Sequence, residues 1–258
     1  MKIKFWLFLL LPGGLLAQYA PKNEIKTNLT AGFTKIFSLQ YERHLTDKIS
    51  LNQTFYYRNR SSIPLGHQLD VLAKRYSLGL TGVDFEHINV DLSQIGVKGY
   101  SPELRFYLGK HKNPVFLGFF GQFERIDAII PASFEMQYEG NNFLLEKVPI
   151  NFDIRSSSGG ILIGKKFNFT ENIKLDVIII GPHIGSAQKV YAVVEQELLN
   201  RLSDTDKDYM RAKIIERFNL SENYYDVSIS DTKAEINAFR KVPYLGIRAV
   251  GLNLGFAF

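Results

Sequence analysis

The chain has 258 residues, of which 45% are hydrophobic and 22% charged, and its formal net charge is +5. It contains no cysteine, which excludes disulfides, thiolate metal sites, a cysteine nucleophile and lipid attachment through an N-terminal cysteine. The excess of basic residues is small and they are scattered along the chain, so we expect no nucleic-acid partner.

Residues 1–17 have the order of a secretory signal peptide. A short basic start precedes a continuous apolar stretch at 5–11, and Ala17 is the small residue expected before a cleavage site. An N-terminal membrane anchor is the alternative, but the apolar stretch is shorter than the roughly 20 residues that a spanning helix needs. We therefore predict an exported mature chain, residues 18–258.

From Glu24 onward the hydrophobic residues recur with a period of two, interrupted by turns. This period indicates strands with one apolar and one polar face. About eight strands are predicted, at residues 26–32, 37–44, 49–58, 100–108, 115–124, 160–164, 173–179 and 249–258.

The connections between these strands alternate between tight and long. Tight ones fall near 46–48, 109–113 and 169–172, and long ones near 60–95, 127–152 and 187–240. Short periplasmic turns and long external loops are typical of a membrane barrel, which turns its apolar face to lipid, whereas a soluble lipocalin-like barrel does the reverse. Aromatic residues near the tight turns, Phe116 among them, fit an interfacial girdle.

No apolar segment of the mature chain is long enough for a transmembrane helix, so a membrane protein built from it would be a closed barrel. We predict an all-β fold, an antiparallel up-and-down transmembrane β-barrel of about eight strands in the bacterial outer membrane, with both termini periplasmic. A soluble periplasmic lipocalin-like barrel is an alternative.

The last long connection, 187–240, departs from the strand period. Apolar residues recur there at helical spacing, and Ser203 with Asp206 matches a capping box. We predict a helical, extracellular insertion in this loop, with apolar stripes formed by Val190, Val193, Val194, Leu198, Leu202, Met210, Ile214, Ile215 and Phe218.

The polar faces of the strands carry charges of both signs. An interior of about eight strands is filled by side chains, and buried charges must be paired, so we expect a salt-bridged plug rather than an open pore. A cluster that handles protons or a ligand is the alternative. The predicted interior network consists of Glu42, Arg58, Glu103, Arg105, Glu124 and Lys166, and His44 is expected to join it.

Other candidate sites are weaker. His183 and Ser186 at a strand end could serve a membrane-embedded acyl hydrolase acting on lipid, but the sequence shows neither an orienting acid nor oxyanion donors. Asp204, Asp206 and Asp208 imitate a calcium loop, yet its required glycine and final glutamate are absent. We therefore expect no catalytic residue, no metal site and no cofactor.

The chain ends on an alternating strand whose Phe256 and Phe258 lie in the apolar register. We expect the barrel assembly machinery to read this aromatic end as an assembly signal.

Several segments resemble an uncharacterised family of outer-membrane β-barrels from Bacteroidota. The similarity lies in the first, second and fourth strands (residues 23–28, 38–43 and 101–109), in the Ala17-Gln18 junction and in the terminal segment 251–258. The resemblance implies a small OmpA-like barrel and carries no catalytic residue to transfer.

We therefore expect a non-enzymatic outer-membrane barrel that presents its surface loops in a structural or ligand-binding role. Its partners would be outer-membrane lipid, the barrel assembly machinery and a surface or envelope protein.

Overall fold

The computed structural model describes residues 22–76, 85–109, 112–138, 141–248 and 250–258. The predicted signal peptide, residues 1–17, lies outside these ranges.

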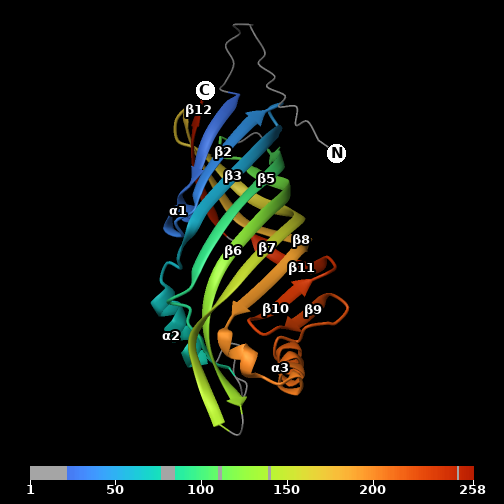
Figure 1. Ribbon diagram of the computed structural model, residues 1–258. Helices are drawn as coiled ribbons and strands as arrows, with labels where there is room; N and C mark the ends of the chain where they lie inside the picture. Colours follow the sequence, from blue (N-terminus) through green and yellow to red (C-terminus); the bar gives the residue numbers. More distant parts are fainter. Residues whose placement is uncertain (1–21, 77–84, 110–111, 139–140, 249) are drawn as a thin grey trace.

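Eight antiparallel strands close into a ring (Figure 1). Each strand pairs with the next, and the last strand pairs with both its predecessor and the first, which closes the barrel. This confirms the predicted all-β barrel of eight strands. The ring consists of β1 (Asn23–Asn28), β2 (Phe37–His44), β3 (Ile49–Ser62), β5 (Gln94–Leu108), β6 (Val115–Tyr138), β7 (Asn141–Asn168), β8 (Ile173–Glu195) and β12 (Gly251–Ala257).

The tight connections and the helices lie at opposite ends of the ring. In Figure 1 the start of β1 and the C-terminus share one end, while α2 and α3 lie toward the other. Thr46 and Thr170 occupy equivalent places in two of the tight turns, where each hydroxyl accepts a backbone N–H three residues on, at 3.1 and 2.9 Å. The elements outside the ring are α1 (Leu29–Phe33), α2 (Gly66–Tyr76), β4 (Phe85–Ile88), η1 (Glu197–Arg201), α3 (Asp204–Arg217), β9 (Tyr225–Ile229), β10 (Lys233–Ala238) and β11 (Val242–Arg248).

Two of the predicted long loops contain regular structure. The connection predicted at 127–152 is mostly strand, because β6 and β7 continue as a paired hairpin toward residues 138 and 141. This hairpin was not predicted, because its two strands contain Pro131 and Pro149 and proline normally argues against a strand interior. In the structure the two prolines lie directly opposite each other. The connection predicted at 60–95 contains the end of β3, helix α2 and strand β4.

The insertion at 187–240 is helical only in part. Helix α3 begins after Ser203, and the predicted capping box with Asp206 is confirmed. The helical spacing assigned to Val190–Val194 was wrong, because this segment continues β8 and pairs with β7 and β10. β-branched side chains favour a pleated strand over a helix, and this preference prevails here. The hairpin of β9 and β10 was not predicted.

Polar side chains lie inside the ring and apolar side chains outside it. Glu42, Asn52 and Arg105 are fully buried. Large apolar side chains on the alternate positions are exposed, among them Ile25, Leu39, Phe55, Phe119, Ile161, Ile179, Leu254 and Phe256. Phe116 is an exception that corrects the predicted girdle, since it is fully buried within the ring. In the described part of the chain, no helix combines the length and hydrophobicity needed to cross a bilayer.

Candidate functional site

Eight charged or titratable side chains from five strands meet inside the ring, and we call them the charge cluster. Alternation along each strand turns every second residue inward, so each strand contributes residues two positions apart or a single residue. The cluster consists of Glu24 and Lys26 on β1, Glu42 and His44 on β2, Glu103 and Arg105 on β5, Lys166 on β7 and Asp176 on β8.

Arg105 contacts three carboxylates and is the centre of the cluster. Its Nε donates to Glu103 at 2.5 Å, and its Nη1 donates to Asp176 at 2.6 Å and to Glu42 at 3.0 Å. The Arg105 side chain has no exposed surface. Such a cation is stable inside a protein only because its charge is compensated on several sides.

Two lysines bind Glu24 and share two of the carboxylates that Arg105 contacts. Lys26 donates to Glu42 and Asp176 and lies 2.9 Å from Glu24. Lys166 donates to both carboxylate oxygens of Glu24, at 2.8 and 2.9 Å. The lysines therefore link the same acidic groups that Arg105 binds, and the cluster forms one network rather than separate ion pairs.

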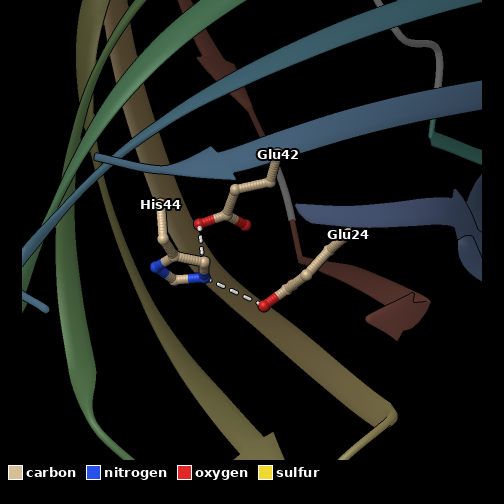
Figure 2. Close-up of side chains that lie close together, drawn as sticks. All are labelled: Glu24, Glu42 and His44. Carbon is tan, nitrogen blue, oxygen red and sulfur yellow. Dashed lines mark hydrogen bonds and ion pairs between the residues drawn. The ribbon is translucent and has the colours of Figure 1, made fainter. Parts of the chain in front are cut away.

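The cluster has four acids but only three permanently charged bases. Arg248 partly compensates, since its Nη1 lies 3.6 Å from Glu103. His44 adjoins two of the acids: its Nε2 lies 3.0 Å from Glu24 and 3.8 Å from Glu42 (Figure 2).

Glu24, Glu42 and His44 have ligand atoms within 4.8 Å of one another, close enough to surround a metal ion. The residues around them do not suit a cation. Lys166 Nζ lies 3.3 Å from His44 Nε2 and bonds to Glu24, and Lys26 bonds to Glu42. A divalent ion would have to enter beside two ammonium groups, so the geometry fits a salt-bridge network better than a metal centre.

Four of the six predicted network residues meet in the cluster, namely Glu42, Glu103, Arg105 and Lys166, and His44 joins them as expected. The other two lie elsewhere. The Arg58 guanidinium donates to the Ser61 and Ser62 carbonyls, and Glu124 accepts a hydrogen bond from Tyr56 at 2.7 Å.

Sequence reasoning missed Glu24, Lys26 and Asp176. A usable signal was present in the alternation: Asp176 lies between Leu175 and Val177, and Glu24 and Lys26 lie on either side of Ile25.

An apolar cluster fills the ring next to the charges. It consists of Tyr107, Phe116, Phe120 and Leu162, all at most 5% exposed. The Arg105 guanidinium lies 4.6 Å from the centre of the Phe116 ring, which joins the two clusters. Gly164 is required here, because a Cβ at this position would lie 2.4 Å from the Phe116 ring. The interior is therefore filled at this level.

The other candidate residues do not form sites. His183 points inward against Phe120 and Tyr244, whereas Ser186, three residues on, belongs to the opposite face of the strand. They therefore do not form the pair that a hydrolase needs. Asp204 and Asp206 lie in the first turn of α3, where Asp206 caps the helix.

A family model described as "Protein of unknown function (DUF3575)" matches residues 5–213. No curated protein and no solved structure matches the chain. The matched range spans the signal-like start, strands β1–β8 and most of α3, and the chain belongs to the DUF3575 family.

Proposed function

We propose that this protein is an integral barrel of the bacterial outer membrane that presents the structured elements at its α2–α3 end to a partner. The observation that carries the proposal is the inverted distribution of side chains, with a buried charge cluster inside the ring and large apolar side chains outside it.

The inversion argues for lipid as the surrounding medium. Phe55, Phe119 and Phe256 are each about half exposed on the outside, and in water this surface would be a large unpaired apolar patch. A transmembrane barrel has an outward apolar band and a polar interior. A soluble lipocalin-like barrel would have the reverse arrangement, so the burial pattern argues against that alternative.

The filled interior argues against transport. Fully buried Arg105, Phe116 and Leu162 occupy the space that a conducting barrel would leave open. The function then belongs to the elements beyond the ring, in keeping with the tendency of binding residues to lie on loops held by a rigid scaffold.

The insertion after β8 is itself a folded unit. Leu199 and Leu202 are buried and pack against Leu198, Met210, Ile229 and Ala234, which joins the 3₁₀ turn, α3, β9 and β10. A surface that is already ordered loses little conformational entropy when it binds, so it is suited to docking an envelope protein.

The remaining parts of the proposal concern export and assembly. Residues 1–17 would direct export and be removed, and the barrel assembly machinery would insert the chain after reading its last strand. Phe256 and Phe258 support this step, since both are more than half exposed on the outer surface of the ring.

Arginine substitutions test the membrane embedding. Leu104→Arg and Val177→Arg, both outward and near mid-height, should each destabilise the folded barrel by about 2–4 kcal/mol in lipid vesicles. Ser228→Arg, at an exposed strand position of the insertion, is the control and should have little effect. Urea titration of the vesicle-inserted protein measures the difference. Equal tolerance of arginine at Leu104 and Ser228 would refute the membrane assignment.

A further inference from the structure

Four basic residues form a continuous row across the outside of four adjacent strands. Lys98 on β5 is directly opposite Arg125 on β6, Arg125 is opposite Arg155 on β7, and Arg155 is opposite Lys189 on β8. Tyr57, half exposed on β3, is opposite Lys98 and extends the row. Direct partners in an antiparallel sheet lie on the same face, so all four cations point outward. We call them the basic row.

The basic row is under-compensated. Directly opposed side chains have Cβ atoms about 5 Å apart, and like charges in such positions repel. Asp153 is shared between Lys189, at 2.6 Å, and Arg125, at 3.1 Å. Among the residues that the structure describes, neither Lys98 nor Arg155 has an acidic partner. An outer surface with this arrangement favours the binding of a negatively charged group.

The position of the basic row along the barrel is equally specific. The next outward residues toward the tight-turn end are Phe55, Tyr100 and Phe123, paired with one another across β3, β5 and β6. Their rings follow each other at 4.8 and 6.5 Å between centroids. The row therefore lies at the edge of the apolar band that is nearer to helices α2 and α3.

An open hollow of about 610 Å³ lies between part of the basic row and these aromatic residues. Its floor and walls are mainly apolar, formed by Phe37, Leu39, Phe55, Tyr100 and Phe123. Lys98 and Arg125 line it as well. Glu124 also lines it, but this carboxylate is on the inward-facing register and accepts a hydrogen bond from Tyr56 at 2.7 Å, so the outer edge of the hollow is cationic. Gly99 also lines it, and glycine is required there because a Cβ would clash with the Tyr56 ring on the interior side.

We propose that this hollow and the basic row bind a phosphorylated glycolipid of the outer leaflet, with an acyl chain against the aromatic residues and its phosphates on the cations. The proposal rests on the membrane embedding proposed above, which places the edge of the apolar band nearer to α2 and α3 at the headgroup level. A row of cations spread over four strands suits a broad head with more than one phosphate better than the single phosphate of a glycerophospholipid.

The test uses the full-length mature barrel in dodecyl maltoside micelles, with lipid A, which carries two phosphates on a disaccharide, as the probe. Native mass spectrometry should show saturable binding of lipid A. The double variant K98Q/R155Q should bind at least about tenfold more weakly, since each charge-assisted hydrogen bond to phosphate contributes about that factor or more. K165Q is the matched control: Lys165 pairs with Val115, the first residue of β6, at the tight-turn end of the band, and its loss should leave binding unchanged.

Two further probes separate the possible occupants without any mutation. Lipid A stripped of its phosphates should bind the unaltered barrel as weakly as lipid A binds the double variant. Phosphatidylglycerol should bind at least about tenfold more weakly than lipid A. Comparable binding of phosphatidylglycerol would overturn the glycolipid assignment, and unchanged binding of lipid A to the double variant would overturn the site.

Failure of this proposal is distinguishable from failure of the membrane assignment. All proteins are first shown to be folded by their heat-modifiable migration on gels. A barrel that tolerates Leu104→Arg refutes the membrane embedding, whereas a membrane-embedded barrel indifferent to lipid A refutes only the glycolipid site.

Discussion

Replacement of Arg105 by methionine tests whether the charge cluster stabilises the barrel through mutual compensation. Methionine keeps a long side chain that can lie against Phe116 but removes the guanidinium from three carboxylates, Glu103 at 2.5 Å, Asp176 at 2.6 Å and Glu42 at 3.0 Å. Removing one partner of a buried ion pair usually costs about 3–5 kcal/mol, because the other charge is left buried without compensation.

The structure indicates which carboxylate loses most of its charge compensation when Arg105 is replaced. Lys26 still contacts Glu42 and Asp176, whereas among the described residues Glu103 keeps only Asn52 at 3.5 Å and Arg248 at 3.6 Å. Most of the loss should therefore come from Glu103. The double variant Glu103→Met with Arg105→Met should recover much of the stability, since replacing both members of a buried pair by apolar residues is often close to neutral.

Urea unfolding in phosphatidylcholine vesicles measures these differences. The only tryptophan is Trp6, in the predicted signal peptide, so circular dichroism and the heat-modifiable gel band are the suitable signals. The control is Arg60→Met, which breaks an exposed 2.8 Å pair with Asp127 and should cost about 0–1 kcal/mol. If Arg105→Met costs no more than Arg60→Met, or the double variant is worse than the single one, the reasoning is refuted.

Three further predictions concern the C-terminus, the insertion after β8 and an ion pair on the outer face of the barrel. Deleting Phe258 should lower the folded, heat-modifiable fraction in outer membranes, and an unchanged fraction would mean that this residue is not an assembly signal. Replacing residues 196–241 by a short Gly/Ser linker should leave the ring folded but abolish crosslinks to an envelope partner. A tag inserted near Ser203 should be labelled on intact cells. A tag that is found in the periplasm, or crosslinks that survive the replacement, would refute the docking role. Burial raises the pKa of Asp153, but the hydrogen bonds and positive charges of Lys189 and Arg125 together outweigh it and hold that pKa below its ordinary value. The small, solvent-screened stabilisation from this pair should therefore be present above the unfolded-state pKa of about 4 and lost as the pH falls through the folded-state pKa. A carboxyl NMR titration should show that Lys189→Ala raises the Asp153 pKa. An unshifted titration would contradict the pairing.

The charge cluster illustrates how far alternation predicts a site. It correctly assigns Glu42, Glu103, Arg105 and Lys166 to the inner face, because successive side chains of a strand point to opposite sides. It assigns Arg58 and Glu124 to the same face, yet these lie beyond the cluster. Alternation specifies the face of a residue but not its height along the barrel axis.

The sequence by itself determined the number of ring strands, the tight turns and the capping box at Ser203, because all three depend on residues close together along the chain. The tertiary structure decided which charges meet. Glu24 and Asp176 reach the same lysine from β1 and β8 only because β12 closes the ring, and the tilt and stagger of a closed sheet set which levels coincide. The hairpin of β6 and β7 likewise depends on cross-strand pairing, which continues without a break from the ring to residues 138 and 141.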